Sequence, residues 1–300
     1  MLLNYKKIIL FIALVFLVNW LMVILFIANG GKWMTPASFV LAAGYMLVPM
    51  VIAIIVQRFI YKEPIKDALG ISFKINRWFI VAWLLPVVIA IAVIGVSIIS
   101  PQVEFVKNPE ASMIFEHFKS ILPAEQLQQM EQQTASMPFH PFWLVLIQGL
   151  IAGISINAVA GFGEELGWRG FLQKELSCMG FWKSSILIGI IWGLWHAPLI
   201  LQGHNYPQHP VIGVFMMVIL CVLLAPIFSY IRLKANSVIA AAIVHGTLNA
   251  TGSLPLIVTK GGNDLIVGVT GLSGFVVLIG VNFSLLFYDR LVAKEQVMSW

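Results

Sequence analysis

Charged residues are scarce in this 300-residue sequence: 10% are Asp, Glu, Lys or Arg, whereas 60% are hydrophobic. A soluble domain carries about 25% charged residues, so these charges cannot cover the surface of a water-soluble globule. Mean hydropathy is correspondingly high, at +0.93. The scarcity argues against a soluble protein and indicates that lipid is the solvent for much of the chain.

Cysteine is also scarce, with Cys178 and Cys221 the only two. They show no CxxC spacing, and no nearby His completes a metal set. This argues against a disulfide framework and a structural zinc site. We expect both cysteines to act as small apolar side chains.

The net charge of +5 does not indicate a nucleic-acid partner, because the basic residues fall at the ends of apolar runs. Of the 18 Lys and Arg residues, fourteen lie in segments predicted to be cytoplasmic, and the other four are Lys32, Lys107, Lys119 and Lys260. The positive-inside rule then predicts a multi-pass protein of the cell membrane with both termini in the cytoplasm. The run from Ile8 to Ala28 is too long for a signal peptide and predicts a first transmembrane helix.

A membrane-spanning helix needs about 20 apolar residues. The sequence predicts eight such segments, at 8–28, 38–58, 78–100, 145–177, 184–202, 211–231, 237–256 and 265–288. We therefore predict an all-α, polytopic membrane helix bundle in which residues 1–300 form one integral membrane domain. The polar connection 101–141 is predicted to be extracytoplasmic, either as amphipathic interfacial helices at 113–122 and 124–133 or as a solvated loop.

Three polar clusters interrupt the apolar segments. They are Glu164-Glu165-Leu-Gly-Trp-Arg169-Gly170, Trp192-Gly-Leu-Trp195-His196-Ala-Pro198 and His245-Gly-Thr-Leu-Asn249. An ionisable side chain within the hydrocarbon region is costly, and its presence indicates a functional site. The tryptophans Trp168, Trp192 and Trp195 lie deep in these segments and are expected to line that site.

Helical spacing assigns different roles to the two adjacent glutamates. Glu165 and Arg169 are spaced i,i+4 and share a helix face, so they can form an ion pair. Glu164 lies about 140° round the helix from Arg169, so it is left facing elsewhere. An unpaired buried carboxylate is the kind of group that acts as a general base. His245 and Asn249 are likewise spaced i,i+4 on one face.

Depth in the membrane provides an independent argument. If the chain turns near Gly180, Glu164 lies sixteen residues before the turn and His196 sixteen after it. In an antiparallel helix pair these residues reach the same depth, about 24 Å along the helix from the turn. His245 lies about ten residues beyond a basic turn at 232–234. Helix–helix hydrogen bonding alone would explain Asn249, but Glu164, His196 and His245 together favour a functional site.

The three clusters resemble the core motifs of the CAAX-protease and bacteriocin-processing family, also called the abortive-infection family or type II CAAX endopeptidases. The motifs are Glu164-Glu165-x-x-x-Arg169, Trp192-x-x-x-His196 and His245-x-x-x-Asn249. The resemblance covers residues 145–255, the predicted catalytic core. Trp192 stands where the family more often has Phe, which leaves the position aromatic.

The resemblance implies an intramembrane peptide-bond hydrolase whose site opens toward the cytoplasm. By position, Glu164 would activate water with the assistance of His196. His245 and Asn249 would bind the substrate carbonyl and stabilise the oxyanion. Glu165 and Arg169 would orient the site. A glutamate-dependent mechanism and a metalloprotease both remain open: zinc would suit Glu164, His196 and His245, but the sequence holds no HExxH motif.

The resemblance implies a membrane-associated peptide or protein as substrate. Prenylated CAAX proteins, or peptides in bacteriocin processing or self-immunity, are the substrate classes that it suggests. Two alternatives come from other functional classes. One is a non-catalytic membrane scaffold or immunity factor, and the other is a proton-coupled transporter in which Glu164 and His196 form a relay. A transporter usually shows two related halves with paired broken helices, and no internal repeat is visible in the sequence.

Overall fold

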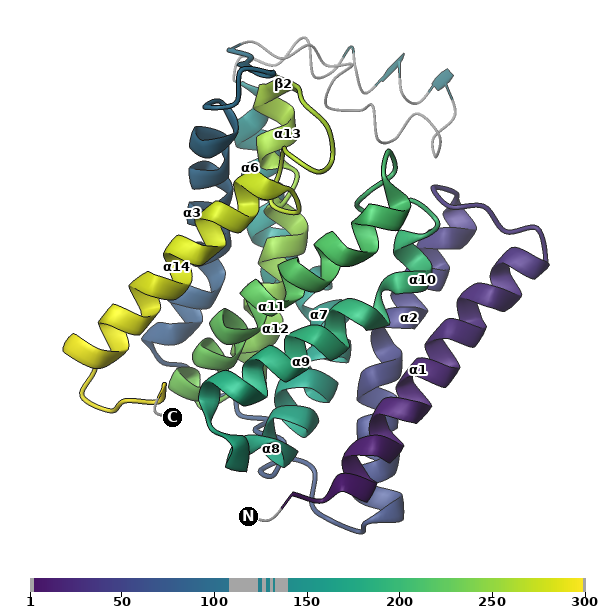
Figure 1. Ribbon diagram of the computed structural model, residues 1–300, viewed down its shortest axis with the longest axis vertical. Coiled ribbons are helices and arrows are strands. Elements are labelled where there is room, and N and C mark those ends of the chain that lie inside the picture. Colours follow the sequence, from purple (N-terminus) through teal and green to yellow (C-terminus); the bar gives the residue numbers. More distant parts are fainter. Residues whose placement is uncertain (1–2, 108–123, 126–127, 130–131, 133–139, 299–300) are drawn as a thin grey trace.

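The computed structural model describes residues 3–107, 124–125, 128–129, 132 and 140–298, which form the helix bundle of Figure 1. The predicted amphipathic segment 113–122 lies outside these residues, as does half of the segment 124–133. The elements are α1 (Tyr5–Ala28), α2 (Pro36–Ile54), the π-helix η1 (Ile55–Ile60), α3 (Arg77–Ser97), β1 (Val103–Phe105), α6 (Pro141–Ile154), α7 (Ile156–Glu165), the π-helix η3 (Leu166–Leu172), α8 (Gln173–Glu175), the 3₁₀-helix η4 (Ser177–Met179), α9 (Phe181–Trp195), α10 (Ala197–Ile200), α11 (Pro210–Ala235), α12 (Val238–Thr251), α13 (Leu254–Val258), β2 (Thr259–Gly261) and α14 (Leu272–Leu291).

The predicted all-α, polytopic membrane architecture is confirmed. Within the described residues, six helices are long and apolar enough to cross a membrane, and a bent pair, Pro141–Ile154 with Ile156–Glu175, brings the number to as many as seven. The predicted span 184–202 corresponds to α9, which has only 15 residues and is shorter than a full span. The protein is a multi-pass membrane protein.

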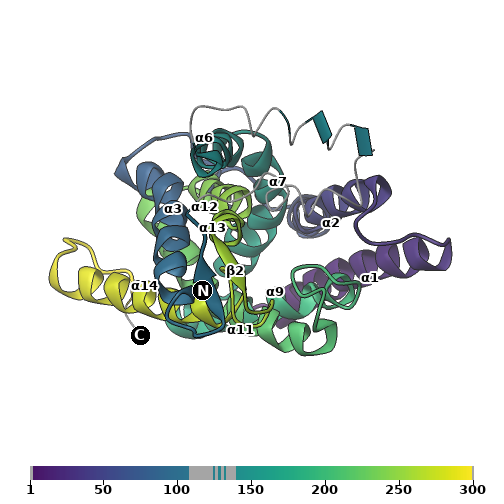
Figure 2. The same cartoon turned by 90° about the horizontal axis from the view of Figure 1, so that it is seen from above.

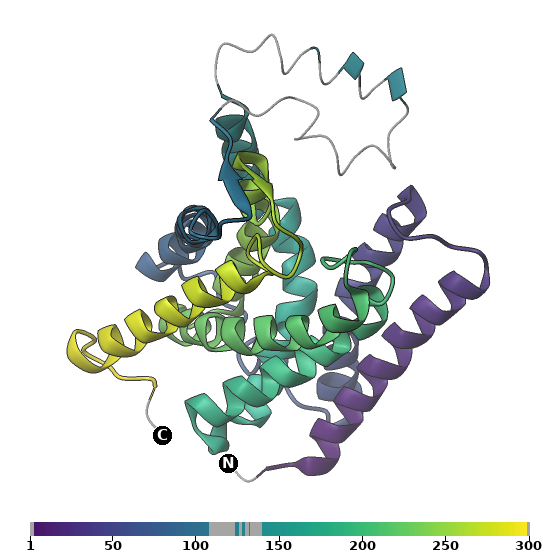
Figure 3. The same cartoon turned by 45° about the horizontal axis from the view of Figure 1, so that its top comes forward.

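Helix α12 lies at the centre of the bundle, packed against α3, α6, α7 and α11. In the segment Val238–Val258, which joins α12 and α13, 67% of the most apolar 18-residue window is buried, compared with 28% for α1 and for α14. These two helices lie at opposite edges of the molecule (Figures 2 and 3). Because α12 carries His245, the central position puts this side chain where several helices can contact it.

The sequence prediction of one continuous helix over 145–177 is wrong. The chain bends by 49° between α6 and α7, at Ser155, whose backbone leaves the helical region (φ −119, ψ −105). The Ser155 hydroxyl donates to the carbonyl of Ile151 at 2.6 Å, a bond that often bends membrane helices. The bend lets both halves of the segment pack against α12.

Glycines bring the bent pair close to α12. A Cβ added to Gly246 would lie 2.6 Å from the backbone nitrogen of Ala158, and a Cβ added to Gly153 would lie 2.4 Å from Oγ1 of Thr247. Small residues allow this close backbone approach in membrane helices. The approach places His245, next to Gly246, within side-chain reach of α7.

The connection 101–141 was predicted without a strand, but it begins with β1, which pairs antiparallel with β2. The last span is shifted from the predicted 265–288 to Leu272–Leu291, because a turn-rich segment follows β2. Of the two cysteines, Cys221 is buried as expected, whereas Cys178 is exposed. Figure 1 shows both chain ends at the same end of the bundle.

Candidate active site

The two glutamates end helix α7, where the backbone changes from α-helix to the π-helix η3. Both side chains are buried, with Glu164 2% and Glu165 0% exposed. A π-helical turn inside a longer helix often marks a functional site. Successive helical residues point about 100° apart, so the two carboxylates enter different surroundings.

The predicted ion pair between Glu165 and Arg169 is present. Nη1 of Arg169 lies 3.1 Å from the Glu165 carboxylate, and both side chains are fully buried. The guanidinium also lies 4.6 Å from the ring centroid of Trp192 and 5.0 Å from that of Phe228. Contact with the ring faces provides further stabilisation of the buried cation.

His245 bridges the two glutamates, a role that the sequence did not reveal. Its Nδ1 lies 2.8 Å from Oε1 of Glu165, and its Nε2 lies 4.0 Å from Oε1 of Glu164. A histidine held by a carboxylate at one nitrogen has a defined tautomer and ring orientation. Glu165 therefore both pairs with Arg169 and directs the second nitrogen of His245 toward Glu164.

Glu164 is positioned by two indole groups. Nε1 of Trp192 donates to Oε2 of Glu164 at 2.7 Å, and Nε1 of Trp168 donates to the same oxygen at 3.4 Å. Both tryptophans had been expected to line the site. Because they bind Oε2, the other oxygen of Glu164 remains directed at His245.

His196 lies at the break between α9 and α10, two residues before Pro198. Its Nδ1 donates to the carbonyl of Trp192 at 2.8 Å, which leaves Nε2 as the acceptor nitrogen. The His196 ring centroid is 4.6 Å from that of Trp195 and 5.8 Å from that of Trp192. His196 therefore packs against Trp192, one of the two tryptophans whose indoles donate to Glu164.

A second hydrogen-bond network fixes the end of α9 beneath His196. The Tyr45 hydroxyl donates to the carbonyl of Trp195 at 2.6 Å. The Trp195 indole donates to Oδ1 of Asn19 at 2.9 Å. Sequence analysis did not single out Tyr45, which is fully buried on α2.

Asn249 is the one predicted site residue that makes no hydrogen bond, ion pair or ring contact with the cluster in the described part of the chain. It lies on α12 one turn beyond His245, as its spacing predicted, but its side chain is exposed. Across the described part of the chain, it has no hydrogen-bonding partner. A role for Asn249 would therefore depend on what binds at this surface.

The donor geometry bears on the suggested zinc site. Within the described residues, no three His, Cys, Asp or Glu side chains are grouped so that they could hold a metal ion. Both candidate histidines, His196 and His245, bind a protein oxygen through Nδ1, which leaves Nε2 of each available, as in histidines that ligate metals. In this structure the candidates Glu164, His196 and His245 are therefore not arranged as a three-ligand centre.

Comparison with known proteins agrees with this geometry. Residues 138–251 match the family model of the type II CAAX prenyl endopeptidase Rce1-like proteins. The CAAX prenyl protease 2 of Methanococcus maripaludis is 34% identical over 143 residues, which are 45% of this chain and 48% of the relative. The chain thus spans about half the length of that curated relative. The matched segment contains all six predicted site residues, and over this segment the chain is similar to type II CAAX prenyl endopeptidases.

Proposed function

We propose that this protein is an intramembrane endopeptidase that hydrolyses a peptide bond of a membrane-associated peptide or protein. The observation that supports this most directly is the 4.0 Å separation between Oε1 of Glu164 and Nε2 of His245. A water molecule can lie at a hydrogen-bonding distance of about 2.8 Å from both atoms at once. Such a water would be held next to a carboxylate that lacks a lysine or arginine partner within the described residues.

Glu164 is the proposed general base. Its Oε2 is occupied by the indole donors of Trp192 and Trp168, so Oε1 accepts the proton from the attacking water. The new C–O bond forms as this proton moves to Glu164. The proton is then delivered to the amide nitrogen as the C–N bond breaks, in keeping with general acid–base chemistry.

His196, His245 and Asn249 are the proposed partners of Glu164. We propose that Nε2 of His196 helps to orient the water, because Nδ1 is held by the carbonyl of Trp192. The exposed Asn249, and His245 when its Nε2 carries a proton, would donate to the substrate carbonyl and stabilise the oxyanion. The removal of one oxyanion donor typically lowers kcat by about 10²–10³.

The proposed topology follows from the distribution of basic residues. We propose that both termini and the opening of the site face the cytoplasm of the cell, in agreement with the positive-inside rule. A reporter that is active only in the cytoplasm, fused to either end of the chain, is expected to be active at both ends. Activity at neither end would refute this orientation.

The decisive experiment is Glu164→Gln, assayed with an internally quenched peptide that ends in Cys-Ala-Ala-X, both farnesylated and unmodified, in liposomes. Glutamine retains an oxygen that can accept from the indoles but cannot take a proton from water. We expect turnover to fall by at least about 10², with the thermal unfolding midpoint nearly unchanged. Turnover at the wild-type rate would refute the assignment of Glu164 as base.

The peptide pair also tests the substrate class. Cleavage of the farnesylated peptide alone would assign prenylated CAAX proteins, whereas cleavage of both peptides would favour unmodified membrane peptides, such as those of bacteriocin processing or self-immunity. The absence of cleavage in wild-type protein would favour the non-catalytic scaffold. Proton uptake into proteoliposomes that is lost in Glu164→Gln, without cleavage, would favour the transporter.

Asn249→Ala tests the oxyanion assignment without a confounding loss of stability. Because Asn249 is exposed and has no described partner, the free energy of unfolding is expected to remain within about 0.5 kcal/mol of wild type. We expect kcat to fall by about 10² or more. An unchanged kcat would remove Asn249 from the proposed site.

A further inference from the structure

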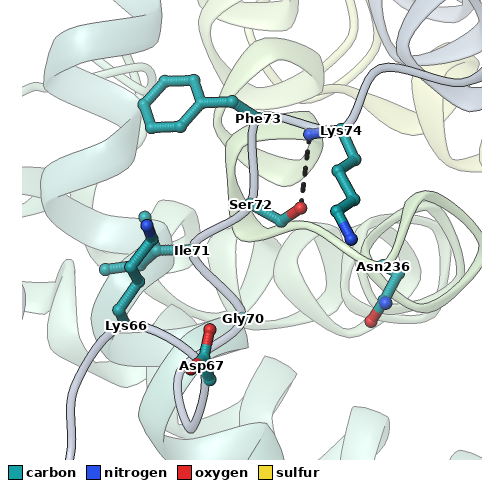
Figure 4. A pocket seen from close by; sticks show the side chains of 8 residues that line it. All are labelled: Lys66, Asp67, Gly70, Ile71, Ser72, Phe73, Lys74 and Asn236. Atoms are coloured by element: carbon teal, nitrogen blue, oxygen red, sulfur yellow. Dashed lines mark hydrogen bonds between the residues drawn. The ribbon is translucent and has the colours of Figure 1, made fainter.

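A cavity of about 550 Å³ lies at the end of the bundle that carries both termini, apart from the glutamate cluster. It is formed by the connection between η1 and α3 and by the turn between α11 and α12. The lining residues, shown in Figure 4, are Lys66, Asp67, Gly70, Ile71, Ser72, Phe73, Lys74 and Asn236.

The cavity carries a net positive charge. Lys66 and Lys74 line it together with one acidic residue, Asp67, and neither lysine forms an ion pair with a described residue. In Figure 4, Lys74 extends toward Asn236, and Ser72 lies between the backbone of Lys74 and that of Ile71. The surroundings therefore favour an anion that is large enough to contact both lysines.

A third cation lies directly behind the wall of the cavity. Gly70 has φ +72, and a Cβ at this position would lie 2.2 Å from Nη2 of Arg232. The guanidinium therefore packs against the backbone of the loop, and it has no carboxylate partner among the described residues. Nε of Arg232 donates to the carbonyl of Arg169 at 3.3 Å. Arg232 therefore contacts both the connection between η1 and α3, at Gly70, and the π-helix η3, at Arg169.

The loop also has the properties of a membrane-surface segment. Phe73 and Ile75 flank Lys74 and are 78% and 79% exposed, although they lie only a few residues before α3 enters the bundle. Exposed apolar side chains that alternate with lysine are typical of segments that lie in the headgroup region. Phe73 and Ile75 therefore give the rim of the cavity an apolar surface next to its lysines.

We propose that this cavity binds the phosphate group of an anionic phospholipid from the leaflet on the side of the termini. Lys66 and Lys74 contact the phosphate, Arg232 adds positive potential from behind Gly70, and Phe73 and Ile75 insert beside the acyl chains. Basic clusters next to membrane helices attract anionic lipids in this way. This binding does not depend on the proposed hydrolase activity.

The test uses the full chain in a non-ionic detergent, titrated with dihexanoyl phosphatidylglycerol, dihexanoyl phosphatidylcholine or inorganic phosphate. Binding is measured as the ligand-dependent rise in the unfolding midpoint. Lys66→Gln/Lys74→Gln is compared with Lys6→Gln/Lys183→Gln, which removes the same charge from two exposed lysines outside the cavity.

We expect the cavity variant to weaken phosphatidylglycerol binding by about tenfold or more, and the control variant to stay within twofold of wild type. Asp67→Asn, which removes the acidic lining residue, is expected to tighten binding. Equal weakening in both double variants would refute the proposal, as would equal binding of phosphatidylglycerol and phosphatidylcholine. Lysine-dependent binding of inorganic phosphate without binding of phosphatidylglycerol would refute the lipid and indicate a soluble anion.

Discussion

Replacement of Glu165 by glutamine tests whether the buried ion pair stabilises the protein. The variant keeps the size of the side chain but leaves the Arg169 guanidinium buried without its counter-charge. The two groups lie 3.1 Å apart, and at an effective dielectric constant of about 20 this corresponds to an attraction of about 5 kcal/mol. Replacing the charged Glu165 carboxylate also removes the free-energy cost of burying that charge. The net loss of stability is therefore smaller than the attraction between the two groups.

We expect Glu165→Gln to lower the free energy of unfolding by about 3–5 kcal/mol. The contacts of Arg169 with Trp192 and Phe228 remain and retain about 0.5–2 kcal/mol of stabilisation. Two further Arg169 atoms, Nε and Nη2, have no hydrogen-bonding partner in the described structure. The remaining partners are therefore too few to replace the carboxylate.

The assay is reversible unfolding in mixed micelles, with Glu165→Gln, Arg169→Gln and the double variant forming a double-mutant cycle. We expect each single variant to be destabilised and the double variant to lose less than the sum of the two. A Glu165→Gln variant within about 0.5 kcal/mol of wild type would refute the ion pair as a source of stability. Glu164→Gln is the matched control, since Glu164 has no arginine or lysine partner in the described residues.

Three further predictions concern other parts of the protein. If the mechanism needs no metal, a chelator will leave peptide cleavage unchanged, and elemental analysis will find less than about 0.1 equivalent of zinc; loss of activity that zinc restores would contradict this. Burial alone would raise the pKa of Glu63, but hydrogen bonds from Lys7 and Lys174 lower it below 4.5. These two contacts therefore stabilise the fold above pH 4.5, and this stabilisation is lost as the pH falls through the lowered pKa of Glu63. Glu63→Gln should accordingly flatten the curve of unfolding free energy against pH below pH 4.5. A curve identical to that of wild type would contradict this prediction. Tyr45→Phe removes the shorter of two hydrogen bonds to the carbonyl of Trp195, the other coming from Nε1 of Trp20 at 3.3 Å. The free energy of unfolding should fall by about 1 kcal/mol, measured by denaturant titration; an unchanged value would contradict a stabilising role for the Tyr45 hydroxyl.

The all-α membrane architecture and the Glu165–Arg169 ion pair could be predicted from the sequence, because both depend on local patterns. The apolar runs indicated most of the spans, and the i,i+4 rule identified the partner of Glu165. The depth argument predicted overlapping depths for Glu164, His196 and His245, but not that His245 lies beside Glu164. The bend at Ser155 was less accessible, since a single serine within a long apolar run is a weak signal.

The contact of His245 with Glu165 could not be predicted, because it depends on the distance between α7 and α12. Gly246 on α12 and Gly161 on α7 allow that distance, and their partners lie far away in the sequence. The break at His196 did have a signal in Pro198, since proline removes a helix hydrogen bond and disfavours helix before it. The predicted span 184–202 nevertheless continues through this proline, whereas α9 ends at Trp195.

In the proposed mechanism, the two adjacent glutamates have different roles, although one base would suffice for the chemistry. Glu165 cannot serve as the base, because its charge is committed to Arg169 and to Nδ1 of His245. Those same contacts hold the second nitrogen of His245 toward Glu164. Stability and turnover should therefore separate between neighbouring positions: Glu164→Gln should remove turnover alone, whereas Glu165→Gln should reduce both. If the two variants lost stability equally, the division of roles between the two carboxylates would be wrong, even if both were inactive.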